Sequence, residues 1–95
     1  KNDPTLPQLI IVNKAYPNPF NPTTSITIKN LFSPQYVKVG IYNLNGQLLE
    51  TLYNDNLKVS TFDLVWNADG YGSGIYILGV FWANGKNSQK ITLIK

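Results

Sequence analysis

The side chains that most often carry out enzyme chemistry are largely missing from this sequence. Its 95 residues include no histidine, no cysteine and no arginine, so the commonest general base, the thiolate nucleophile and the bidentate anion clamp are all absent. Catalysis would have to rest on five carboxylates, and these show no spacing typical of a glycosidase pair. They are Asp3, Glu50, Asp55, Asp63 and Asp69. We therefore expect a protein that is not an enzyme.

Two Asx-rich segments, Asn54-Asp55-Asn56 and Asn67-Ala68-Asp69-Gly70, contain oxygen ligands of the kind that Ca²⁺ prefers. Each segment holds only one carboxylate, which is too little charge for a strong site. Asx residues are also typical of turns, where their side chains hydrogen-bond to the local backbone. We expect turns at both segments, and neither a metal nor another cofactor.

The sequence is rich in aromatic residues, with six tyrosines and two tryptophans. A platform on which sugar rings stack would require Tyr36, Tyr53, Tyr71 and Trp82 to share one exposed face. The favoured alternative is that most rings fill or flank the core, because burial of large rings contributes much of the folding free energy. Trp82 follows Phe81 in a predicted strand, so the two side chains point to opposite faces of the sheet. Trp82 is therefore the ring whose exposure would best support a platform.

The positive charge of the chain is dispersed along the sequence. Eight lysines give a net charge of +3, and because they do not cluster, the sequence does not predict nucleic-acid binding. A weak contact with anionic polysaccharide stays open. No apolar run approaches the roughly 20 residues of a membrane helix, so we do not expect the chain to span a membrane.

The length of the chain suits one domain with a single core. Residues 1–8 include two prolines and several polar residues, a composition typical of a linker from a preceding domain. The domain itself is predicted over residues 9–95. Because the sequence contains no methionine, we expect it to be a fragment or a processed product of a larger protein.

Short apolar and β-branched runs alternate with turn residues along the rest of the chain, a pattern typical of all-β sandwiches and barrels. Seven strands are predicted, at 9–15, 24–29, 36–43, 47–50, 62–66, 75–83 and 88–95. We expect an immunoglobulin-like sandwich in the fibronectin-III style, with strands three, four, six and seven in one sheet and strands one, two and five in the other. A seven-stranded barrel is the alternative.

Turn residues fix several of the connections. Asn45-Gly46 and Asn84-Gly85 are predicted hairpin turns, the first of type I′ with positive φ angles. Pro17, Pro19 and Pro22 lie in a segment that cannot be a central strand, because proline lacks a backbone donor; we expect a stiff, extended connector.

Alternation along the strands also predicts which side chains are buried. The residues expected between the two sheets are Ile26, Ile28, Val39, Ile41, Phe62, Leu64 and Trp66. The run Ile75 to Ala83 is apolar on both faces, which predicts the most buried strand of the fold.

Three segments in series carry a resemblance to a known family: Tyr16-Pro-Asn-Pro-Phe-Asn-Pro-Thr-Thr24, Val39-Gly-Ile-Tyr-Asn-Leu-Asn-Gly-Gln-Leu-Leu-Glu-Thr-Leu52 and Trp66-Asn-Ala-Asp-Gly-Tyr-Gly-Ser-Gly-Ile-Tyr76. With the closing Lys90-Ile-Thr-Leu-Ile-Lys95, they resemble the type A C-terminal sorting domains of the type IX secretion system and the related immunoglobulin-like domain of flagellar hook-cap proteins. The structural motif comprises Pro17, Asn18, Pro19, Pro22, Asn45, Gly46, Trp66, Gly74 and Tyr76.

The resemblance implies an address label on an exported bacterial protein, recognised at the outer membrane by the secretion machinery. The parent protein would be secreted or held at the cell surface. Carried over to this sequence, the recognition element would be Lys90, Ile91, Thr92, Leu93, Ile94 and Lys95, presented by the Asn84-Gly85 turn. An edge strand with free backbone groups could pair there with a receptor strand.

Two other functions are compatible with the sequence. The first is an accessory module that holds a secreted hydrolase against polysaccharide, which the aromatic content suggests. The second is a structural spacer that stabilises the preceding domain.

Overall fold

The computed structural model describes residues 10–31 and 35–95. The predicted linker lies outside these residues and stays a prediction. Seven strands make up the fold: β1 (Ile10–Val12), β2 (Thr23–Asn30), β3 (Gln35–Tyr42), β4 (Leu48–Leu57), β5 (Thr61–Asn67), β6 (Gly74–Trp82) and β7 (Gly85–Leu93). No helix that could span a membrane occurs in this part of the chain.

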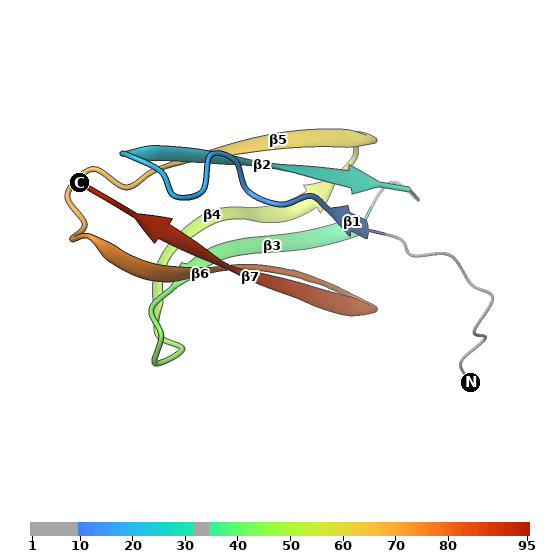
Figure 1. The fold of residues 1–95 in the computed structure, drawn as a ribbon. Coiled ribbons are helices and arrows are strands. Elements are labelled where there is room, and N and C mark those ends of the chain that lie inside the picture. The colour runs from blue at the N-terminus through green and yellow to red at the C-terminus, as the bar shows by residue number, and fades with distance from the viewer. Residues whose placement is uncertain (1–9, 32–34) are drawn as a thin grey trace.

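The strands form two antiparallel sheets, with the orders β1-β2-β5 and β4-β3-β6-β7. Figure 1 shows these sheets as two layers, with β2 and β5 in one and β3, β4, β6 and β7 in the other. The predicted sandwich and its division of strands are therefore confirmed. The barrel alternative is wrong, because the two sheets have separate strand orders.

The core lies between the inner faces of the sheets, where strand alternation places every second side chain. Ile26 and Ile28 of β2, Val39 and Ile41 of β3, and Trp66 of β5 are all buried, as predicted. The other two predicted core residues, Phe62 and Leu64, are only half-buried and pack against this cluster.

The prediction that Ile75 to Ala83 is the most buried strand is wrong. Strand β3 buries Val37, Val39, Gly40 and Ile41, whereas β6 buries only Leu78, Gly79 and Val80. Only one face of each sheet packs on the other sheet, so the apolar residues on the outer face of β6 stay near the surface. Ile75 is accordingly 44% exposed.

The hairpin between β3 and β4 forms where it was predicted, but its turn differs. The Gly46 amide donates to the Asn43 carbonyl at 3.0 Å, and among these residues only Gly46 (φ 85°) has a positive φ. The connection is therefore a type I turn followed by a left-handed glycine, a common three-residue hairpin loop, and not type I′. The Asn43 side chain stabilises this loop by accepting from the amides of Asn45 and Gln47, each at 2.9 Å.

The second hairpin turns one residue earlier than predicted, since Gly85 already pairs with Trp82 in the β6–β7 ladder. The turn residues are Ala83 and Asn84, and neither has a positive φ. Gly85 instead lies close to another side chain: a Cβ atom there would lie 3.0 Å from the Trp82 ring, so the indole would have to shift.

Of the two Asx-rich segments, only one is a turn. Asn54-Asp55-Asn56 lies within strand β4, so the turn predicted there is wrong. In the other segment, the Asn67 carboxamide accepts from the Asp69 amide at 2.9 Å, and Gly70 has a φ of 97°. The described residues contain no group of three or more acidic, histidine or cysteine side chains that could hold a metal ion.

Candidate functional site at the C-terminal strand

The predicted recognition element forms the end of β7 and the tail behind it. Its side chains divide between the core and the surface because the strand alternates. Ile91 and Leu93 are buried in the core, while Lys90, Ile94 and Lys95 are exposed. Thr92 is half-buried. The surface that a receptor could contact therefore carries the side chains of the even-numbered residues and of Lys95.

The backbone edge of this part of β7 is covered by the proline-rich connector. The Asn18 side chain donates to the Lys90 carbonyl at 3.0 Å and accepts from the Thr92 amide at 2.9 Å. Phe20 continues the contact: its amide donates to the Thr92 carbonyl, and its carbonyl accepts from the Ile94 amide. Asn18 thus uses its carboxamide as a peptide group would be used in a neighbouring strand.

The same connector also bonds the opposite sheet. Tyr16 and Ser25 of β2 exchange two backbone hydrogen bonds, and the Pro17 carbonyl accepts from the Thr24 hydroxyl at 2.7 Å. The Pro22 carbonyl accepts from the Ala68 amide at 2.8 Å. In Figure 1 the connector is the blue segment that passes between β2 and β7.

The connector is bent, so the expectation of an extended segment is wrong. Residues 17–19, 21 and 22 form bends, and all three prolyl bonds, before Pro17, Pro19 and Pro22, are cis. The bends let one short segment reach both sheets in turn, which an extended strand lying along one sheet could not do.

A second carboxamide links the two sheets near the connector. The Gln89 side chain accepts from the Ala15 amide at 2.7 Å and donates to the Asn13 carbonyl at 3.1 Å. Nothing in the sequence pattern singled out Gln89, because a glutamine in a polar strand position is usually a solvent-exposed residue. We refer to the Asn18, Phe20 and Gln89 contacts together as the clasp.

The clasp changes how the tail could be recognised. The Lys90 carbonyl, the Thr92 amide and carbonyl and the Ile94 amide, which a receptor strand would need, are already bonded to Asn18 and Phe20. The expectation that this edge is free for strand addition is therefore wrong from Lys90 to Ile94. A receptor that meets the folded domain would contact the side chains of the tail.

An aromatic cluster supports the tail from inside. Trp66 lies within 5.3 to 5.6 Å, centroid to centroid, of the rings of Phe20, Tyr71 and Tyr76. The Tyr76 hydroxyl donates to the Gly72 carbonyl at 2.6 Å, and the Lys95 amide donates to the Ser73 hydroxyl at 3.0 Å. The loop between β5 and β6, which joins β6 at Gly74, thus holds both the cluster and the last residue.

One carboxylate serves this cluster. Glu50 Oε1 accepts from the indole Nε1 of Trp66 and from the Tyr71 hydroxyl, both at 3.1 Å. Burial, and then the hydrogen bond and negative charge of Glu50, raise the pKa of Tyr71 above its ordinary value. Glu50 therefore has a structural role as the acceptor for the donors of the buried Trp66 and the half-buried Tyr71.

The four rings considered for a sugar-stacking platform do not share a face. Tyr36 lies on the outer face of β3 with its hydroxyl bonded to the Asn54 side chain, whereas Tyr53 and Trp82 pack against the core from the inner faces. Tyr71 belongs to the cluster around Trp66. Trp82 is half-buried, so it is not the exposed ring that the platform needed.

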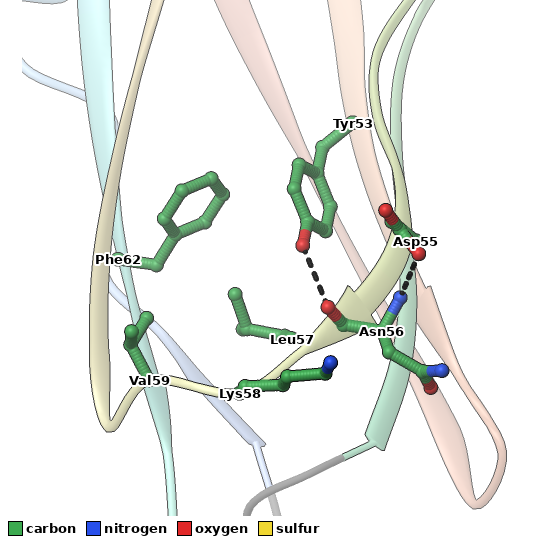
Figure 2. Close-up of a pocket in the computed structure, with 7 residues that line it drawn as sticks. All are labelled: Tyr53, Asp55, Asn56, Leu57, Lys58, Val59 and Phe62. Carbon is green, nitrogen blue, oxygen red and sulfur yellow. Dashed lines mark hydrogen bonds between the residues drawn. The ribbon is translucent and has the colours of Figure 1, made fainter.

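A separate hollow lies at the connection between β4 and β5, at the end of the sandwich opposite the C-terminus (Figures 1 and 2). Its volume is about 420 Å³. Figure 2 shows the rings of Tyr53 and Phe62 beside each other, with centroids 4.7 Å apart, and the Tyr53 hydroxyl donating to the Asn56 carbonyl at 2.9 Å. The Asn56 amide also donates to the Asp55 carboxylate at 2.7 Å, and no residue of the tail lines this hollow.

These features define a small all-β sandwich whose last strand is pinned at its edge and displays alternate side chains to solvent. The family described as a secretion system C-terminal sorting domain matches residues 14–95. The chain belongs to this family, the type IX C-terminal sorting domains. Domains of this family target the proteins that carry them for export to the cell surface or for secretion. Neither the curated proteins nor the solved structures gave a match.

Proposed function

We propose that the chain is a non-catalytic sorting module that the type IX machinery recognises at the outer membrane through the exposed side chains of Lys90, Ile94 and Lys95 and the half-buried side chain of Thr92. The observation that carries this proposal is the pinned tail. Its backbone is held by Asn18, Phe20 and Ser73, so the backbone positions from which these side chains extend are fixed. A receptor then loses little conformational entropy from the tail on binding.

The chemistry of this surface favours a partner that combines an apolar contact with negative charge. Ile94 is 54% exposed, and Lys90 and Lys95 lie on either side of it in the sequence. Exposed lysines steer association with an acidic surface, and a central apolar side chain contributes burial on binding.

The test is export of an inert reporter fused to the whole chain in a bacterium that has the type IX machinery. Deleting residues 90–95 would be a poor experiment, because it removes Ile91 and Leu93 from the core. The informative variant combines Lys90→Ala, Ile94→Ser and Lys95→Ala, which changes only exposed side chains. We expect it to keep its thermal unfolding transition and to leave the reporter inside the cell.

The matched control combines Lys29→Ala, Lys58→Ala and Val65→Ser, three exposed positions away from the tail. It alters the same kinds of side chain and should be exported normally. Normal export of the tail variant would overturn the proposal, and equal loss from both variants would show a general effect of surface change.

A further inference from the structure

The clasp covers only the C-terminal half of the outer edge of β7. In the β6–β7 ladder, residues with even numbers point their backbone groups away from β6, as the bonds of Lys90 and Thr92 to Asn18 show. Lys86 and Ser88 share this parity. Within the described chain, their outward amide and carbonyl groups have no hydrogen-bond partner.

Strand β1 presents a second open edge opposite this one. The Asn13 amide donates to the Thr27 carbonyl of β2, so alternation turns the backbone groups of Ile11 toward β2 and those of Val12 away from it. Among the described strands, β1 pairs only with β2. Within residues 10–31 and 35–95, the two sheets of the sandwich therefore each end, on this side, in a strand whose outer edge is open.

A hollow of about 390 Å³ lies between these two edges. Its walls are residues 10–12 of β1 and residues 84–87 of the β6–β7 hairpin, and Trp82 also lines it. We call this hollow the β1–β7 slot. In Figure 1, the turn that joins β6 to β7 lies at the same end of the sandwich as β1.

The charge around the slot has one sign. Lys86 lines the slot, and Lys14 and Lys90 line an adjoining hollow of about 560 Å³ farther along β7. No carboxylate lines either hollow among the described residues. An acidic segment would therefore be attracted to this side of the molecule.

We propose that the β1–β7 slot binds an extended, acidic segment of a partner protein, which adds to β7 as an antiparallel strand at Lys86 and Ser88. Main-chain hydrogen bonds to β7 provide affinity, and alternate side chains provide specificity. Apolar side chains on one face of the segment contact Val12 and Trp82. Carboxylates on its other face lie near Lys86 and Lys90, whose side chains share the outer face of the sheet.

A second copy of this chain is a poor occupant. Two β7 strands paired antiparallel about Ser88 would set Lys86 of one copy opposite Lys90 of the other, and like charges directly opposite each other are destabilising. Charge complementarity therefore favours a different, acidic strand.

The probe is the capped peptide Thr-Glu-Val-Thr-Val-Glu-Thr, whose glutamates have the spacing of Lys86 and Lys90 and whose valines share the other face. The control peptide replaces both glutamates with lysine. Binding to the purified chain is followed by fluorescence anisotropy, and the site by amide hydrogen exchange. We expect the acidic peptide to bind more tightly and to slow exchange at Lys86 and Ser88.

The decisive variant is Ser88→Pro. Proline is tolerated where the lost donor points away from the ladder, so the fold should survive while the slot loses a donor and gains a steric block. We expect peptide binding to weaken by about tenfold or more. Val65→Pro is the matched control, because Val65 has the same outward parity on the open edge of β5; it should bind the peptide as the unchanged chain does.

The proposal fails if the acidic peptide does not protect these amides, if Ser88→Pro and Val65→Pro bind it equally, or if the lysine peptide binds as well. It also fails if protection appears without peptide as the protein concentration rises, because the occupant would then be a second copy. The measurement uses purified protein, so its failure is distinct from a failure of export.

Discussion

At the scale of single residues, the side chains that matter here act through hydrogen bonds to the backbone. Asn18 and Gln89 each present a donor and an acceptor to main-chain groups of a strand or connector that has no regular ladder partner at that point. A carboxamide can replace a peptide unit in this way because it offers the same two functions in a planar group.

Replacing Asn18 should measurably weaken the domain. Asn18→Ala removes two hydrogen bonds to β7, and we expect the free energy of unfolding to fall by about 1 to 2 kcal/mol. Asn18→Asp should also destabilise, because a carboxylate cannot donate to the Lys90 carbonyl. Urea denaturation measures both, with Asn84→Ala, at an exposed turn position, as the control. Unchanged stability in Asn18→Asp would show that the donated bond contributes nothing.

Tyr71 should make stability depend on alkaline pH. Its pKa is raised in the folded state by burial and by Glu50, so folding favours the protonated hydroxyl. The resulting stabilisation is complete below the unfolded pKa of about 10 and is lost as the pH rises through the higher folded value. Urea midpoints between about pH 8 and 11 should fall less steeply for Tyr71→Phe than for the unchanged chain. Parallel curves would contradict this.

At the scale of elements, the loops decide how the strands pair. The β3–β4 hairpin depends on a left-handed residue at Gly46, and the aromatic cluster depends on the loop that joins β6 at Gly74. Each loop needs a backbone conformation that few residues adopt easily, whereas the strands themselves tolerate many apolar residues.

Gly46→Ala should destabilise the domain by about 1 to 2 kcal/mol, because an L side chain at a φ of 85° is strained. No atom lies within 4 Å of the added Cβ, so the loss would report backbone conformation and not a clash. Gly72→Ala is the control, since it also has open space around its Cβ and its φ lies outside the positive range. The melting temperatures of both variants are compared by thermal unfolding. Equal melting temperatures for Gly46→Ala and Gly72→Ala would refute the strain argument.

At the scale of the whole molecule, the core and the tail are one structure. Trp66 is 1% exposed and contacts Phe20, Tyr71 and Tyr76. Phe20 in turn bonds the tail. Packing at the centre of the sandwich is therefore coupled to the position of the proposed recognition surface.

Trp66→Ala should cost about 3 to 5 kcal/mol of unfolding free energy, the usual range for removal of a fully buried ring. A protein of this size has a total stability of about 5 to 15 kcal/mol, so this loss removes a large fraction of it and should lower the urea midpoint strongly. Val65→Ala on the same strand is the control, because Val65 is 62% exposed. A cooperative transition at the same urea concentration for both variants would contradict the inward placement of Trp66.

The sequence by itself determined the features that depend on local pattern. Strand alternation and turn residues were sufficient to predict the number of strands and their division between two sheets. They also predicted the burial of Ile26, Ile28, Val39, Ile41 and Trp66. The three motif segments were sufficient to identify the family. These features follow from residues close together in the chain, where backbone geometry and side-chain parity restrict the structure strongly.

Only the tertiary structure decided the features that join distant residues. The clasp connects Asn18 to Lys90 and Ala15 to Gln89 across more than 70 positions, and no local rule relates them. The burial of Phe62 and Leu64 and the open part of the β7 edge likewise depend on how the two sheets meet. The reason is physical: a backbone group or side chain is free or covered according to what packs beside it, and in a sandwich that neighbour comes from the other end of the chain.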